Sequence, residues 1–311
     1  MPDKTHVELP DPPATILASG DSETRRHELE SLSAAGRECA RSLLGMPNGA
    51  GSNHAAQRVG ELDGKLKRAL AAGIPPAGPV RLTADQRWIY DHLGRVRTAL
   101  AEVRASKRAL DGMAHARRNG GEAAPRIIFL AQDALAALER RFNEAAFSAF
   151  VNGFQSVTVL SQRELYGLPA ALKLVLLERI AECLSQADKR ATEFDSGKDA
   201  PGVGASAESC IRSLLAITEV SWRELLEPLT VFERVLREDP AGAYAGMDFD
   251  SRAMYRGAVT HMAEHSEHSE LEIAEMALAL ARTAARGSAA ESGPPANAFA
   301  FAGVQDYQLK A

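Results

Sequence analysis

The chain has 311 residues, of which 45% are hydrophobic, 5% are aromatic and 25% are charged, and its formal net charge is −5. Acidic and basic residues are interspersed, which excludes a chain-wide attraction to nucleic acid or to anionic lipid. The length exceeds that of a usual single core. Because Ala and Leu are abundant and aromatic residues are few, we expect an all-α fold, either an antiparallel multi-helix array or two packed helical subdomains.

The cysteines and the apolar segments indicate the compartment. Cys39, Cys183 and Cys210 are odd in number, far apart and without metal-ligand spacing, which predicts buried thiols in a reducing compartment. The N-terminus lacks the basic and apolar regions of a signal peptide. The most apolar stretch, 168–177, contains Lys173 and is shorter than the roughly 18 residues of a membrane span. We therefore predict a cytoplasmic protein that reaches a membrane only through a partner.

The first part of the chain predicts an arm followed by helices. Residues 1–20 are rich in proline and without periodicity, so we expect a disordered arm. A first helix is predicted to follow Asp21 or Ser22. A short helix follows, with Leu62, Leu66 and Leu70 at helical spacing.

A longer helix is predicted from a capping residue at Thr83 to about Arg118. Its buried face is given by apolar residues at intervals of three and four, namely Trp88, Leu93, Val96, Leu100, Val103 and Leu110. After a break rich in Gly and Ala, residues 127–150 give a further helical face. The N-terminal helices are thus predicted to occupy 21–120.

The second half contains three sequence patterns of the capping-box type, in which Ser is followed three residues later by Glu. They are Ser161 with Glu164, Ser221 with Glu224, and Ser269 with Glu272. The first predicts that the strand-like run 157–159 leads into a turn and a helix, with Pro169 near the helix start. The second predicts a helix that ends at Asp239 and Pro240 and contains a kink at Pro228.

The boundaries follow from composition. Residues 195–207 are rich in Gly, Ser, Asp and Ala and predict an internal linker. After Gly287 the composition turns to Gly, Pro, Ala and Ser, which predicts a disordered tail over 288–311. The second helical region is therefore predicted to cover 121–287.

Two groups of residues could hold a metal ion. Asp248 and Asp250 have the Asp-x-Asp spacing by which carboxylates bind a divalent ion beside a nucleotide diphosphate. No predicted strand precedes them, and Asp250 with Ser251 can cap a helix instead, which is the interpretation that we prefer. His261, His265 and His268, with Glu264 and Glu267, could bind Zn²⁺. A capped helix at Ser269 favours a solvated helix end.

Three other patterns also favour ordinary structural roles. Glu224 and Glu227 could act as acid and base, but no nucleophile or Gly-rich pocket accompanies them, and we expect both to be solvated. A basic run is interrupted by acids and predicts a solvated helix face rather than a phosphate or lipid site; it comprises Arg95, Arg97, Arg104, Lys107, Arg108, Arg117 and Arg118. Residues 202–204 read Gly-Val-Gly without the strand or later residues of a dinucleotide site.

One stretch is more specific than a helical pattern. It reads Trp-Arg-Glu-Leu over 222–225, Val-Phe-Glu-Arg-Val-Leu-Arg-Glu-Asp-Pro-Ala-Gly-Ala-Tyr over 231–244, and Met-Asp-Phe-Asp-Ser-Arg-Ala-Met-Tyr-Arg over 247–256. These residues resemble a signature segment of bacterial cyclic β-1,2-glucan synthases. Weaker similarity to the same family covers about 125–285, including 154–158, 164–177 and 271–280, with a faint extension at 88–104.

The resemblance implies a helical region that precedes a membrane-embedded transferase using UDP-glucose and a phosphorylase-like domain that trims the glucan. The chain departs from the family pattern after Gly287. We therefore expect no catalytic, cofactor-binding or metal-ligating residue and no cofactor, and we leave enzyme status open.

The function expected from this resemblance is a non-catalytic accessory or regulatory module of carbohydrate metabolism. It would support glucan synthesis by a protein partner, such as a membrane-embedded glucan synthase, without binding nucleic acid or spanning the membrane itself. Two alternatives stay open. One is a fragment of the glycosyltransferase enzyme itself, and the other is a freestanding helical scaffold that dimerises through its apolar faces. The sequence leaves the oligomeric state undetermined.

Overall fold

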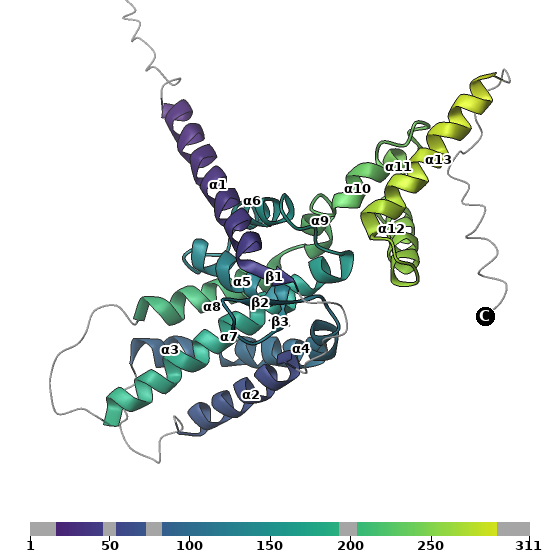
Figure 1. The fold of residues 1–311 in the computed structure, drawn as a ribbon. Helices are drawn as coiled ribbons and strands as arrows, with labels where there is room; N and C mark the ends of the chain where they lie inside the picture. The colour runs from purple at the N-terminus through teal and green to yellow at the C-terminus, as the bar shows by residue number, and fades with distance from the viewer. Residues whose placement is uncertain (1–16, 46–53, 73–82, 193–203, 291–311) are drawn as a thin grey trace, which may run out of the picture.

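The computed structural model describes residues 17–45, 54–72, 83–192 and 204–290. Within these ranges the chain forms thirteen helices and one small sheet (Figure 1). The helices of the first half are α1 (Leu17–Ser42), α2 (His54–Ala72), α3 (Ala84–Asp91), α4 (Leu93–Asp111), α5 (Arg126–Ala137) and α6 (Glu144–Gln155). Those of the second half are α7 (Gln162–Thr192), α8 (Gly204–Glu219), α9 (Trp222–Leu226), α10 (Val231–Leu236), α11 (Ala243–Gly246), α12 (Phe249–Glu264) and α13 (Glu270–Ala290). The predicted helical fold class is confirmed.

The larger core lies around α7, which packs against α2, α4, α5 and α8. Its centre is apolar over successive turns of α7, with Leu168, Leu172, Leu174, Leu177 and Ile180 all fully buried. Apolar residues on several sides of a helix are typical of a helix that other helices surround. This explains why the run that the sequence marks as most apolar lies at the centre of the fold.

A smaller core joins α10, α12 and α13. It consists mainly of Phe232, Leu236, Tyr244, Val259 and Ile273. Figure 1 shows α10 to α13 gathered on one side of the molecule and α2, α3, α4, α7 and α8 on the other. The polypeptide thus has two apolar clusters of unequal size, and it passes from one to the other between α9 and α10.

Helices α1 and α6 cross in close contact because each has a glycine at the crossing. A Cβ atom added to Gly36 would lie 2.9 Å from the amide nitrogen of Phe154, and one added to Gly153 would lie 2.8 Å from the Cα of Ser33. Both distances are shorter than any that real Cβ atoms show. Glycine is therefore required at both positions for the two backbones to approach.

A small sheet, which the sequence patterns do not predict, contacts α2, α4 and α5 of the larger core. Its strands are β1 (Leu43–Gly45), β2 (His115–Arg118) and β3 (Ala124–Pro125), in the antiparallel order β1-β2-β3. Leu43 pairs with Arg118. The prediction that one helix continues to Arg118 is therefore wrong, because Gly112 ends α4 and the following segment is extended.

Several helix boundaries differ from the predicted ones. The helix predicted from Thr83 is broken at His92, although the predicted capping role of Thr83 is confirmed, and the structure adds Gln86 as its partner in a capping box. The single helix predicted to follow Ser221 is two short helices, because α9 ends before Pro228 and α10 begins at Val231. Pro169 lies inside α7 rather than near its start, at the cost of one backbone hydrogen bond.

Hydrogen bonds show which of the three predicted capping boxes are formed. The box at Ser161 is complete, since its amide donates to Glu164 at 2.9 Å and its hydroxyl accepts from the Glu164 amide at 3.3 Å. The box at Ser269 with Glu272 is formed in the same way, at 2.7 and 3.3 Å. At Ser221 no side-chain capping bond is present, so that prediction is wrong.

The predicted arm, linker and tail fall mostly outside the described residues. Of these segments, 17–20 belong to α1, 204–207 to α8 and 288–290 to α13, so these residues are helical rather than irregular. The division into regions at 120 and 287 stays a prediction. None of the described helices has the length and the apolar character that a membrane span needs. Cys39, Cys183 and Cys210 are buried thiols that form no disulfide with one another, as predicted.

Candidate functional site

Four of the residues that carry the resemblance form, together with Glu227, a cluster of polar and charged side chains at the smaller core. Arg256 on α12 donates to Glu227 at 2.9 Å and to Glu233 of α10 at 3.1 Å. Tyr244 of α11 donates its hydroxyl to Glu233 at 2.6 Å, and Arg252 donates to Glu227 at 2.7 Å. The side chains of Arg256 and Glu233 are only 1% and 2% exposed. We call these five residues the ion cluster.

The local sequence explains how Tyr244 reaches this position. The Asp239 carboxylate accepts hydrogen bonds from the amides of Ala241, Ala243 and Tyr244, at 3.1, 2.9 and 3.3 Å. Gly242 supplies the positive φ of 66° that the turn requires. The Asp-Pro-Ala-Gly-Ala-Tyr segment is therefore a turn that directs the tyrosine side chain toward Glu233.

Burial and pairing with arginines have opposite effects on the pKa of the Glu227 carboxyl group in the ion cluster. Burial raises the pKa of Glu227, but hydrogen bonds and charge from Arg252 and Arg256 outweigh it, so that the pKa lies below its usual value. Burial and the hydrogen bond to Glu233 raise the pKa of the Tyr244 hydroxyl, which therefore stays protonated. Glu227 is therefore ionised beside Arg252 and Arg256, and Tyr244 contributes a neutral phenol to the ion cluster.

These contacts fit a structural role for the ion cluster. Its carboxylates bind basic groups and a phenol of the same chain, and they join α9 to α12 through side chains that are remote in sequence. The prediction that Glu224 and Glu227 are both solvated is correct for Glu224, which is exposed. It is wrong for Glu227, whose side chain is only 12% exposed, because Arg252 and Arg256 of α12 cover it.

A cleft of about 770 Å³ lies between the two cores. Its larger-core wall includes the ion pair of Arg126 with Glu164, and its smaller-core wall includes Thr260 and Glu270. The Glu270 carboxylate accepts from the Gln162 amide and the Thr260 hydroxyl, both at 2.8 Å. Burial raises its pKa. The polar groups of this cleft mainly bind one another and so join the two cores.

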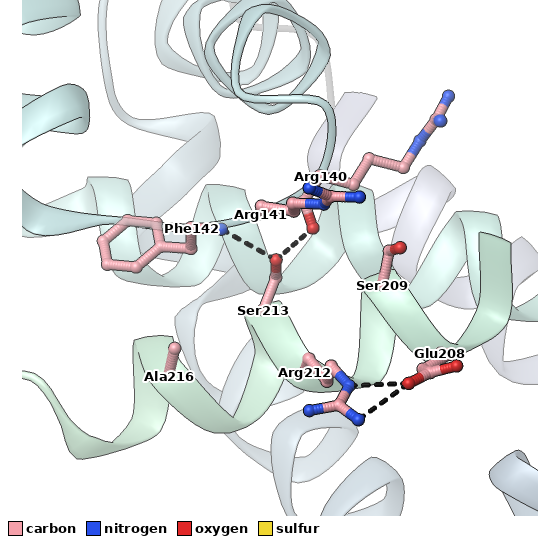
Figure 2. Close-up of a pocket in the computed structure, with 8 residues that line it drawn as sticks. All are labelled: Arg140, Arg141, Phe142, Glu208, Ser209, Arg212, Ser213 and Ala216. Atoms are coloured by element: carbon pink, nitrogen blue, oxygen red, sulfur yellow. Dashed lines mark hydrogen bonds and ion pairs between the residues drawn. The ribbon is translucent and has the colours of Figure 1, made fainter. Parts of the chain in front are cut away.

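A second pocket, of about 500 Å³, lies between the α5–α6 loop and α8 (Figure 2). Arg140, Arg141 and Phe142 line it from the loop, and Ser213 and Arg212 line it from α8. Sequence reasoning missed this pocket, since Arg140 and Arg141 lie about 70 residues before Ser213 of α8 and belong to no motif. The adjacent pair of arginines was the only signal for it.

The Asp-x-Asp pair is a helix start. The Asp248 carboxylate accepts from the amide and the hydroxyl of Ser251, both at 2.8 Å, and caps α12. The hydrogen bonds from Ser251 lower the pKa of Asp248. Asp250 lies in the first turn of α12 and pairs with Arg223 at 2.5 Å. The capping interpretation holds, although Asp248 rather than Asp250 is the capping residue.

The histidines lie at the exposed end of α12. The rings of His261 and His265 are 4.3 Å apart between centroids, and His265 ends the helix. His268 is exposed in the turn before α13, as predicted. In the described parts of the chain, no three His, Cys, Asp or Glu side chains are grouped as metal ligands.

The basic run is divided between two structures. Arg95, Arg97 and Arg108 are exposed on α4, whereas Arg118 lies in β2 and binds Asp133 with two hydrogen bonds of 3.0 and 2.7 Å. Arg104 pairs with Asp63 of α2. The predicted single solvated face is thus correct only for the α4 part. Residues 202–203 of the Gly-Val-Gly pattern lie outside the described residues, and Gly204 begins α8.

Comparison with known proteins gives a distant relationship. No protein family profile matches the chain. The chain is similar to the cyclic β-(1,2)-glucan synthase NdvB of Rhizobium meliloti (strain 1021), with 22% identity over 302 aligned positions. The match covers 73% of this chain and 10% of the relative, so the chain spans about a tenth of the length of the protein that it matches. The chain is therefore a distant relative of part of a glucan synthase.

Proposed function

We propose that this chain is a non-catalytic helical accessory module that supports glucan synthesis from UDP-glucose by a catalytic neighbour. The proposal rests on where the residues that resemble the glucan synthases lie in the structure. Glu233, Tyr244, Arg252 and Arg256 all belong to the resembling segment, and all four take part in the ion cluster. In this proposal, the residues that the chain shares with the synthases serve to hold helices together, which is what a supporting module needs.

The partner surface that we favour is on α13. Met276 and Leu280 are 44% and 73% exposed, and they lie one turn apart on the same side of the helix. Large apolar side chains that stay exposed on a neighbouring pair of turns favour a contact with another protein. In this proposal the chain is cytoplasmic and reaches a membrane only through that protein.

The first experiment measures the size of the native protein by immunoblot of source cells, with an antibody against residues 210–285. A band much larger than 33.3 kDa would indicate that the chain is a supporting region within a larger synthase. A band near 33.3 kDa would indicate a separate subunit that binds the synthase as its partner. In either case, deleting the coding region for 222–256 should lower the cellular content of cyclic β-1,2-glucan. Unchanged glucan content would contradict the proposal.

The two alternatives have their own tests. Turnover of UDP-glucose by the purified chain would contradict a non-catalytic role and support the glycosyltransferase alternative. A stable dimer in light scattering, together with unchanged glucan content in the deletion strain, would support the freestanding scaffold.

A further inference from the structure

We propose that the pocket between the α5–α6 loop and α8 binds the phosphate group of a small soluble molecule, through Arg140, Arg141 and Arg212. This proposal is independent of the glucan-synthase relationship. It rests on three observations: a strained loop, an excess of positive charge and a pocket of suitable size (Figure 2).

The loop that carries two of the arginines is strained. Glu139 and Arg140 have φ values of 50° and 58°, in the left-handed region that side-chain-bearing residues avoid. The Ser213 hydroxyl fixes this conformation by donating to the Arg140 carbonyl and accepting from the Phe142 amide at 3.0 Å. Strained backbone is concentrated at ligand sites, where surrounding structure imposes it. Here the surrounding structure is α8, the other wall of the pocket.

The charge of the pocket is opposite to that of the protein. Among the described residues, no acidic side chain forms a hydrogen bond or ion pair with Arg140 or Arg141, whereas Arg212 pairs with Glu208 at 2.7 Å. The lining of the pocket therefore contains three guanidinium groups and one carboxylate, which gives it an excess of two positive charges in a chain of net charge −5. Such a local excess attracts anions.

The chemistry of the arginines selects the kind of anion. Guanidinium groups bind phosphate through paired N–H···O bonds, and a phosphate dianion neutralises both excess charges, whereas a carboxylate neutralises one. The volume of about 500 Å³ lies in the usual range for small-molecule sites and exceeds that of one phosphate ion. The pocket therefore has room for the rest of a phosphorylated molecule.

The test is titration calorimetry of the full chain with inorganic phosphate and with pyrophosphate. We expect saturable binding of both, with pyrophosphate tighter because it carries more charge. The Arg140→Gln/Arg141→Gln double variant should weaken binding by about tenfold or more. The control is Arg95→Gln/Arg97→Gln, which removes the same charge from the exposed face of α4 and should change affinity by less than about twofold.

A third variant should increase the affinity for pyrophosphate, an effect that misfolding cannot produce. Glu208→Gln removes the carboxylate that competes for Arg212, and it should strengthen pyrophosphate binding several-fold. Absence of saturable binding by the unaltered chain up to about 10 mM would overturn the proposal, as would an equal loss in the α4 control. Sedimentation with phosphatidylcholine vesicles containing phosphatidic acid is the last arm. Vesicle binding that depends on Arg140 and Arg141 without pyrophosphate binding would replace the soluble ligand with a membrane headgroup.

Discussion

Arg256 and Glu233 form a hydrogen-bonded ion pair at 3.1 Å in which both side chains are almost completely removed from water. A buried pair of this kind contributes little net stability, but removing Arg256 takes from the buried Glu233 carboxylate a partner that Arg237, at 2.9 Å, and the Tyr244 hydroxyl replace only in part. Arg256→Met should therefore lower the free energy of unfolding by about 3 kcal/mol, the lower end of the range for a broken buried pair, as measured by urea denaturation.

Two further variants control this prediction. Arg223→Met removes one member of an exposed pair with Asp250 and should cost less than about 1 kcal/mol. The double variant Arg256→Met/Glu233→Leu should recover part of the loss, because no buried charge then lacks its partner. Equal losses of unfolding free energy for Arg256→Met and Arg223→Met would show that the ion cluster is exposed to water, contrary to the structure.

The Tyr244 hydroxyl donates to a buried carboxylate at 2.6 Å, so Tyr244→Phe removes one charged hydrogen bond and little volume. We expect the free energy of unfolding to fall by roughly 1.5–3 kcal/mol. Tyr166→Phe is the matched control, since Tyr166 is 43% exposed, and it should change stability by less than about 0.5 kcal/mol. Chemical denaturation of both variants decides whether the phenol is needed.

Gly153→Ala should separate α6 from α1, because the added methyl group would collide with the backbone of Ser33. The expected loss is about 2 kcal/mol or more, in the range for forced repacking of a core. Gly94→Ala on α4 meets nothing within 4 Å and should raise stability by about 0.5–1 kcal/mol through helix propensity. Opposite signs for the two substitutions in thermal melts would support the close crossing, and a stabilising Gly153→Ala would contradict it.

The lowered pKa of Glu227 predicts how stability depends on pH. A carboxyl group whose pKa is lower in the folded state than in the unfolded state stabilises the protein above the usual value of 4.5, and this stabilisation is lost as pH falls through the folded pKa. The difference in unfolding free energy between the unaltered chain and Glu227→Gln should therefore be largest near neutral pH and shrink in acid. A difference that is constant from pH 7 to about pH 3 would rule out the ionised pair.

Burial raises the pKa of the Cys210 thiol to about 11, although the charge of Arg140 acts in the opposite direction. The thiolate is the reactive form, so Cys210 should resist alkylation by iodoacetamide at pH 8 and react after unfolding in urea. Mass spectrometry of peptides from native and unfolded samples measures this directly. Labelling of Cys210 in the native protein would mean that α8 opens readily.

Some features of the protein could be read from its sequence because their causes are local. Apolar residues at intervals of three and four predicted the buried face of α4, where Val96, Leu100, Val103 and Leu110 are all buried. The capping boxes at Ser161 and Ser269 were also found, since side chain and backbone partner lie within one turn of helix. Helical class, several helix starts and the buried thiols were therefore determined by the sequence itself.

Other features depend on contacts between distant segments, which no local pattern encodes. Glu227 looked like a surface acid until Arg252 and Arg256 of α12 were brought against it. The sequence of β2 looked like a continuation of the preceding helix. In the structure its backbone pairs with β1, a strand far away in the sequence. The pocket of Arg140 and Arg212 likewise exists only because Ser213 holds the loop over α8. Burial, charge pairing and pocket shape are set by which surfaces meet, and only the tertiary structure decides that.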